Sequence, residues 1–114
     1  MLVPMDSNPR LVLSTAPDPV VARRLATGLV AGHLAACVNL LPGVTSIYGW
    51  EGAVEEASEV LMVIKTRAAL VERVESFLGE EHPYATPECV SLAPERVEAR
   101  YLQWLMKWTE EAGA

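Results

Sequence analysis

Basic residues and long hydrophobic runs are both scarce in this sequence. Nine lysines and arginines stand against fifteen aspartates and glutamates, which gives a formal net charge of −6. Because nucleic-acid-binding domains present basic patches, this balance argues against a nucleic-acid partner. No run approaches the roughly 18 apolar residues that a membrane span requires, and the first ten residues lack the features of a secretory signal. We therefore expect no membrane association and a cytoplasmic location.

Cysteine is equally scarce. The two cysteines, Cys37 and Cys89, each lie within a β-prone run, and neither has a second cysteine or a histidine at the close spacing of a zinc or redox motif. The simplest interpretation of each is a small buried side chain. The sequence also contains no glycine-rich phosphate loop and no nucleophile–base constellation. We therefore predict that the protein is not an enzyme.

The length and composition are those of one globular domain. The chain has 114 residues, of which 51% are hydrophobic and 21% are charged, and such a composition is typical of a folded domain. Residues 1–10 carry two prolines and no periodic pattern, so we expect a flexible N-terminal extension. Residues 11–114 are expected to form a single domain.

The first half of this domain is predicted to contain a strand, a helix and a long hairpin. The strand covers residues 11–16. Asp18 is expected to cap the helix, with Pro19 in its first turn and Gly32 as its stop. The hairpin has strands over residues 37–50 and 60–66, joined by an acidic segment that reverses the chain. Pro42 and Gly43 predict a bend or bulge within its first arm.

The second half is predicted to contain two more helices and one strand. Thr66 is expected to cap a helix that ends at Gly79. The prolines of residues 82–87 predict a rigid connector, and a strand over residues 88–93 follows. Pro94 and Glu95 are expected to open the last helix.

This order predicts an α+β fold, a ferredoxin-like βαββαβ sandwich with an extra C-terminal helix and a long hairpin. Right-handed crossovers give an antiparallel sheet of strand order 4-1-3-2, with both main helices on one face. Cys37 and Cys89 then lie on opposite edges, about 14 Å apart. A disulfide requires Cα atoms within about 7 Å, so we expect none within the chain. The hairpin is longer than the sheet needs, and its uncovered edge predicts pairing with neighbouring subunits.

Several segments, taken in order and at their spacing, resemble the CutA family of divalent-cation tolerance proteins. The similarity covers roughly residues 11–108. The segments that carry it are Ala35-Ala36-Cys37-Val38-Asn39, Pro42 to Tyr48, Trp50-Glu51-Gly52, Lys65-Thr66, His82-Pro83-Tyr84, Thr86-Pro87-Glu88 and Tyr101-Leu102 with Trp104.

The resemblance implies a ferredoxin-like subunit that assembles as a tight homotrimer, similar in architecture to the PII signalling proteins. It also implies association with divalent metal ions, copper among them, and a role in the response to metal ions. It implies no established reaction. The alternative function is a PII-like trimeric signalling protein that binds a small metabolite in the clefts between subunits.

His82 is the best candidate metal ligand, because imidazole suits Cu(II) and other divalent cations. Glu81 can add an oxygen donor, and Cys37 is a candidate thiolate. The alternative for His82 is a loop histidine whose ring hydrogen-bonds a backbone carbonyl and holds the turn. Copper-binding members of the family have a cysteine and a histidine where this chain has Ser14 and Glu81. We therefore expect any copper-type site to be weak.

Two further sets of residues complete the candidate sites. An anionic metabolite would use a ligand cleft that contains Lys65, Arg67, Tyr84 and Glu88. Alternatively, Lys65 is a snorkelling edge residue, or it pairs with a carboxylate such as Glu88 across the sheet. The large aromatic residues expected at the trimer interface are Tyr48, Trp50 and Trp104. With Tyr84, these aromatic residues are also able to line a pocket.

Overall fold

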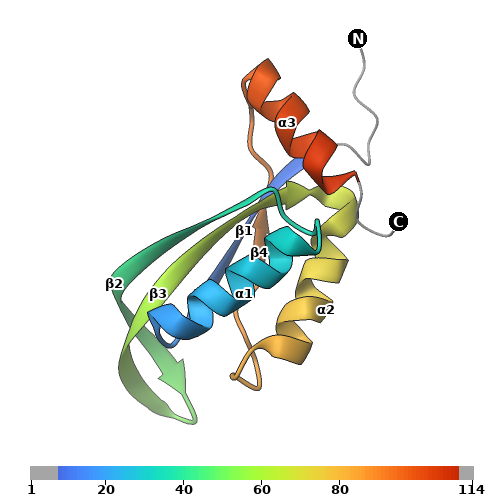
Figure 1. Ribbon diagram of the computed structural model, residues 1–114. Coiled ribbons are helices and arrows are strands. Elements are labelled where there is room, and N and C mark those ends of the chain that lie inside the picture. The colour runs from blue at the N-terminus through green and yellow to red at the C-terminus, as the bar shows by residue number, and fades with distance from the viewer. Residues whose placement is uncertain (1–7, 111–114) are drawn as a thin grey trace.

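The computed structural model describes residues 8–110, which form a four-stranded antiparallel sheet and three helices (Figure 1). The strands are β1 (Pro9–Ala16), β2 (Cys37–Trp50), β3 (Ala53–Arg67) and β4 (Val90–Leu92). The helices are α1 (Pro19–Ala31), α2 (Val71–Glu81) and α3 (Ala99–Thr109), with a 3-10 turn, Ala68–Leu70, before α2. The sheet order is β2-β3-β1-β4, which confirms the predicted α+β class and strand order.

Helices α1 and α2 lie side by side on one face of the sheet, as predicted (Figure 1). Every second residue of β1 and β3 faces these helices, because side chains alternate between the two faces of a strand. The core that results is apolar and contains, among others, Val12, Met62, Ile64, Leu25, Leu29, Val74 and Leu78. Helix α3 lies against the end of the sheet, near β3 and β1. None of the described helices is both long and apolar enough to cross a membrane.

Local signals correctly predicted the two ends of α1. The Asp18 carboxylate accepts a hydrogen bond from the amide of Val21 at 2.9 Å, and Pro19 is the first helical residue. Gly32 ends the helix, and its amide donates to the carbonyl of Gly28 at 3.0 Å. The amide of Val21 at the start of the helix and the carbonyl of Gly28 near its end therefore both have partners.

The predicted limits of α2 were wrong at both ends. Thr66 is buried, and its hydroxyl donates to the carbonyl of Leu34 at 2.6 Å instead of capping a helix. Helix α2 begins at Val71 without a side-chain cap. Gly79 lies inside the helix without the positive φ of a glycine stop, and the helix continues to Glu81, with His82 as its C-cap. A proline after His82 disfavours helical geometry there, which explains the later end.

The hairpin is tighter than predicted, because the acidic segment is a strand and not a wide turn. Strand β3 begins at Ala53, which pairs with Trp50. The turn consists of Glu51 (φ 48°) and Gly52 (φ 80°), and two residues with positive φ form the turn that suits the twist of a hairpin. The pairing shifts between Leu41 and Val44, so the predicted irregularity at positions 42 and 43 is confirmed.

Three other boundaries differ from the predictions. Strand β1 begins at Pro9, so two residues of the expected extension pair with β3; residues 1–7 lie outside the described residues. Strand β4 covers only Val90–Leu92. Helix α3 begins at Ala99 rather than near Pro94, and Glu98 caps it.

Strands β2 and β3 extend well beyond the rest of the sheet. Strand β1 ends at Ala16, which pairs with Val60, whereas β2 and β3 continue to their turn. The projecting part, residues 44–59, is called the arm below. It gives the described chain an elongated outline of 50 × 27 × 22 Å (Figure 1). In the described structure, β3 pairs with β1 on the side away from β2, and β1 ends before the arm begins. The strands of the arm therefore have free outer edges.

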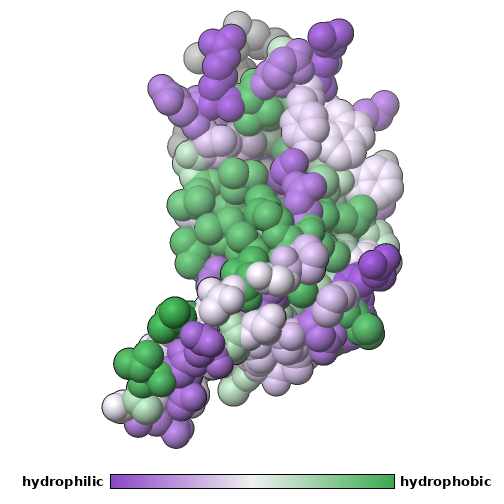
Figure 2. All heavy atoms as spheres, turned by 90° about the vertical axis from the view of Figure 1, so that its left-hand side faces the viewer, coloured by the Kyte–Doolittle hydropathy of each residue, from purple (hydrophilic) through white to green (hydrophobic). Residues whose placement is uncertain are grey.

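The sheet face opposite α1 and α2 is apolar and open. Leu13, Leu61 and Val63 are half-buried there, while Leu41, Val90 and Leu92 are exposed. Figure 2, which views the molecule from the side of β2, shows a continuous hydrophobic area at mid-height above the arm. This open face and the arm are the two surfaces that a single chain leaves uncovered.

Candidate functional site

The ring of His82 is buried and both of its nitrogens are hydrogen-bonded. Its exposed fraction is 7%. Nε2 lies 2.7 Å from the carbonyl oxygen of Thr15, and Nδ1 lies 3.0 Å from the amide nitrogen of Tyr84. Because an amide only donates and a carbonyl only accepts, Nδ1 is the acceptor and Nε2 carries the proton. The neutral ring thus links the end of β1 to the loop that follows α2.

Tyr84 extends this hydrogen-bond chain to the base of the arm. Its hydroxyl donates to Oε2 of Glu59 at 2.7 Å, and its ring lies tilted against His82 with centroids 4.6 Å apart. The Glu59 side chain is only 8% exposed. Burial, followed by the hydrogen bond to this carboxylate, raises the pKa of Tyr84 well above its usual value. The hydroxyl is therefore a neutral donor at physiological pH.

The three predicted metal ligands do not come together. Glu81 is exposed and lies 3.7 Å from Nη1 of Arg24. Cys37 pairs with Lys65, whereas Thr15, which binds His82, pairs with Leu61. Four residues of β3 separate these positions, which is about 13 Å along the strand.

The donors that are present do not fit a copper site within one chain. Both nitrogens of His82 are occupied, and the hydroxyl of Ser14 is buried in the core without a hydrogen-bond partner among the described residues. Residues 8–110 contain no group of three or more histidine, cysteine, aspartate or glutamate side chains placed to hold a metal ion. The arrangement of His82 is the alternative one, a loop histidine that holds its turn. Cys37 and Cys89 are both half-buried free thiols.

The predicted ligand cleft divides into two distant parts. Lys65 and Arg67 lie beside α3: Nζ of Lys65 is 3.2 Å from the hydroxyl of Tyr101, and Nε of Arg67 donates to Thr109 at 2.9 Å. Tyr84 lies near the other end of β1, where its hydroxyl bonds Glu59. Lys65 contacts Tyr101 and not Glu88, which is exposed. Within one chain, the four residues form no single pocket.

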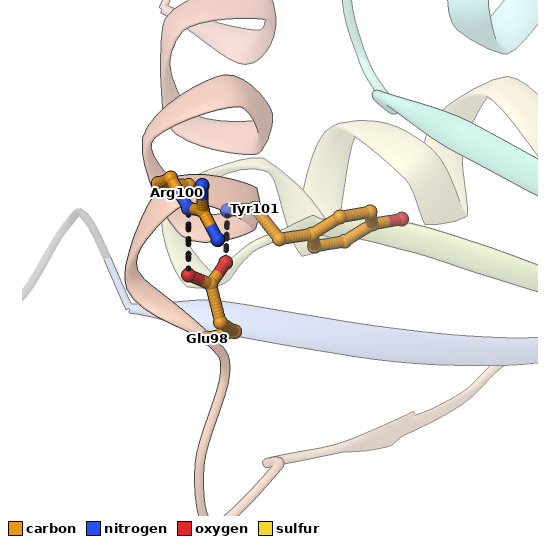
Figure 3. A network of polar contacts seen from close by, with 3 residues as sticks. All are labelled: Glu98, Arg100 and Tyr101. Carbon is orange, nitrogen blue, oxygen red and sulfur yellow. Dashed lines mark hydrogen bonds and ion pairs between the residues drawn. The ribbon is translucent and has the colours of Figure 1, made fainter.

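The start of α3 places Tyr101 beside Lys65. Glu98 accepts hydrogen bonds from the amide of Tyr101 at 2.9 Å and from Nε of Arg100 at 3.3 Å (Figure 3). These bonds, that of the Tyr101 amide first, lower the pKa of the Glu98 carboxyl. The Tyr101 side chain points away from this cap, and Nζ of Lys65 lies 5.5 Å from its ring centroid (Figure 3).

The aromatic residues predicted at an interface are exposed but lie in two separate places. Tyr48 and Trp50 belong to the arm, with exposed fractions of 44% and 54%. Trp104 lies on α3, 48% exposed, with its ring centroid 5.4 Å from that of Tyr101. Sequence reasoning missed Glu59, because the acidic segment before residue 60 was expected to reverse the chain, whereas it is part of β3. No local pattern of the segment indicated an earlier start of the strand.

A comparison with protein families decides the assignment. The model of the family described as "CutA1 divalent ion tolerance protein" matches residues 10–108. The chain belongs to this family. The suggested resemblance is therefore confirmed over nearly all of the described structure.

Individual CutA proteins are similar in sequence. Human Protein CutA is 47% identical over 96 residues, which are 84% of this chain and 54% of the human protein. The divalent-cation tolerance protein CutA of Pectobacterium atrosepticum is 45% identical over 95 residues, which are 83% of this chain and 86% of that protein. The chain thus spans about half the length of the human, mouse and bovine relatives it matches.

Solved CutA structures share the fold. CutA1 from Oryza sativa superposes with a TM-score of 0.89 at 35% identity, covering 95% of this chain and 99% of that one. The divalent cation tolerance protein from Thermus thermophilus gives a TM-score of 0.83 at 42% identity, covering 85% of this chain and 94% of that one. The long β2–β3 hairpin therefore belongs to a fold shared with known CutA proteins.

Proposed function

We propose that this CutA-family chain is the ferredoxin-like subunit of a homotrimer that serves tolerance to divalent cations. The printed names of its relatives motivate the cation role. The observation that carries the assembly is the open apolar face of the sheet, next to an arm with free strand edges. We propose a cytoplasmic location because both thiols are free, as is usual in a reducing compartment.

The open face of the sheet supports assembly with further copies of the same chain. Monomeric proteins rarely leave a contiguous apolar surface of this sort uncovered. Long free strand edges attract further strands, and natural proteins cover them. A cyclic assembly of identical chains covers both, because each arm reaches a neighbour and each neighbour offers the same open face. Tyr48 and Trp50 on the arm and Trp104 on α3 then lie at the trimer interface.

A matched pair of substitutions tests the assembly. Light scattering of the wild-type protein should give a mass near three times 12.4 kDa. Leu92→Lys places a charge on the open face and should reduce the mass to that of one chain, whereas Val20→Lys on α1 should not. Both side chains are exposed, at 45% and 79%, so neither change disturbs the core. A monomeric wild-type protein at micromolar concentration would exclude the proposal.

The proposed contact with divalent cations is weak and does not use a copper centre built on His82. A copper-type ion would have to displace the Tyr84 amide from Nδ1. Calorimetric titration with Cu(II) and Zn(II) should therefore give indistinguishable isotherms for the wild type and for His82→Gln, in which an amide group can still hydrogen-bond. Loss of a strong binding phase in this variant would identify His82 as a ligand after all.

A PII-like metabolite sensor remains the second candidate, and one observation favours it. The Lys65 ammonium contacts the Tyr101 hydroxyl and lies 5.5 Å from the centroid of that ring, which in turn packs against Trp104. It has no carboxylate partner among the described residues. A cation of this kind at the edge of an interface suits an anionic metabolite. If carboxylate metabolites or nucleotides raise the melting temperature, metals do not, and Lys65→Met abolishes the effect, this candidate is preferred.

A further inference from the structure

The arm leaves the body of the protein at a single position, where three features coincide. Along β3 toward the tip of the arm, Val60 is the last residue that pairs with β1. The register of the hairpin shifts on the opposite strand at the same level, between Leu41 and Val44, so positions 42 and 43 lie opposite Val60. The adjacent residue of β3 on the arm side, Glu59, accepts the hydrogen bond from the Tyr84 hydroxyl.

The strands alone fix the direction of the arm poorly at this position. Beyond Val60 the sheet narrows from β1, β2 and β3 to a ribbon of two strands, and two-stranded ribbons twist more than wider sheets. A bulge bends its strand locally. Pro42 has no amide to donate, and Gly43 adopts a φ of 74°. A contact from outside the ribbon is needed to hold one direction.

The loop after α2 supplies this contact. Nε2 of His82 is hydrogen-bonded to the carbonyl oxygen of Thr15, and Thr15 is the second-to-last residue of β1. Its other nitrogen accepts from the amide of Tyr84 at 3.0 Å, and the Tyr84 hydroxyl reaches Glu59 at 2.7 Å. The path therefore begins at the end of β1 and finishes on the first residue of the arm that β1 does not pair with.

We propose that His82 and Tyr84 form a strut that sets the direction of the arm and thereby controls assembly with a second copy of the chain. This inference rests on the proposed homotrimer. Both are positioning residues: they act through Glu59 on the arm and need no contact with the neighbour. The fold is shared with the CutA family, whereas the strut follows from the hydrogen bonds of this chain itself.

The buried Glu59 carboxylate explains why the position of the arm depends on the hydrogen bond from Tyr84. Glu59 is 8% exposed, and the Tyr84 hydroxyl is its hydrogen-bond donor among the described side chains. A buried carboxylate without a donor is unfavourable. When the hydroxyl is removed, the base of the arm therefore moves until water reaches Glu59. That movement changes the angle at which the arm meets a neighbour.

Two readouts separate this positioning role from a merely structural one. The first is the dissociation constant of the oligomer, measured by sedimentation for Tyr84→Phe. The second is the distance distribution between spin labels at Thr27 on α1 and Ala53 at the tip of the arm, in a chain whose two native cysteines are replaced by serine. Ser76→Ala is the control, since it removes an exposed hydroxyl that bonds the Glu72 carbonyl within α2 and lies outside the strut.

We expect Tyr84→Phe to raise the dissociation constant of the oligomer about tenfold or more, which is the effect of losing one hydrogen bond to a charged group. The distribution of distances between the spin labels should also broaden. The control should change neither readout. Tyr84→Phe/Glu59→Gln should recover part of the assembly, because the buried charge is gone. An oligomeric wild type whose Tyr84→Phe variant keeps both readouts would overturn the strut, even if its melting temperature falls. A wild type that never assembles would instead contradict the proposed function.

Discussion

Gly28 in α1 faces the ring of Phe77 in α2 so closely that a Cβ atom at position 28 would lie 2.7 Å from Cζ of Phe77. The absence of a side chain at Gly28 therefore lets the two helices approach each other over the sheet. Phe77 is half-buried and packs against the core. The pair determines how the helix layer closes, and the loop that carries His82 follows directly from α2.

We predict that Gly28→Ala destabilises the protein despite the better helix propensity of alanine. Alanine in a helix gains up to about 1 kcal/mol over glycine, but overpacking in a tight contact costs about 1–3 kcal/mol. In a Phe77→Leu background the contact is absent, so the same change should be stabilising. Urea unfolding of the four variants measures this as a double-mutant cycle. Additive effects would show that Gly28 and Phe77 do not conflict.

Ser14 and Thr66 are predicted to respond oppositely to loss of their hydroxyls. Both side chains are fully buried, but Ser14 Oγ has no hydrogen-bond partner among the described residues, whereas Thr66 donates to Leu34. Ser14→Ala should raise the free energy of unfolding by about 1 kcal/mol, and Thr66→Val should lower it by about 1–2 kcal/mol. Equal losses from both changes would mean that Ser14 has a partner in solution.

Stability should fall as the pH rises above about 9. Burial raises the pKa of the Cys89 thiol above its ordinary 9.0, and nearby Glu75 and Glu88 add to this effect. Burial and Glu59 likewise raise the pKa of Tyr84 above 10.0. A group whose pKa is raised by folding contributes stability that is complete below its unfolded pKa and is lost as the pH rises through the folded pKa.

Urea unfolding between about pH 8 and pH 11, at a fixed protein concentration, measures this loss. Cys89→Ala should flatten the lower part of the decline, and Tyr84→Phe should flatten the upper part. Cys37→Ala serves as the control for removing a thiol. An equal slope in all four proteins would show that other groups cause the alkaline loss.

Sequence patterns predicted those parts of the fold that depend on neighbouring residues. Asp18 and Pro19 define the start of α1, and Pro42 with Gly43 marks the irregular pairing of β2. In each case the physical cause lies within a few positions of the residue itself. The order of the sheet was predictable as well, because right-handed crossovers leave few arrangements for this series of elements.

The errors came from contacts between residues far apart in the chain. Thr66 was expected to cap a helix, but its partner Leu34 lies 32 positions away. For His82 the sequence left a ligand role and a turn-holding role open, and the hydrogen bond that buries its ring has its partner at Thr15, 67 positions away. The acidic residues 55, 56 and 59 disfavour strand structure by propensity. The long ladder with β2 outweighs this preference, which no local pattern could reveal.

The register shift between Leu41 and Val44 has a consequence for sequence change in this hairpin. Because two residues of β2 oppose one residue of β3 there, the odd-numbered side chains of β2 share the face of Leu61 before the shift, and the even-numbered ones share it afterwards. Deleting one residue at positions 42–43 would restore a regular ladder and leave Tyr48 opposite Glu55 and Trp50 opposite Ala53, on the same face as before. Deleting the second residue as well would shift the later pairs by one residue and turn both side chains to the other face. The hairpin therefore tolerates the loss of one residue there but not of two.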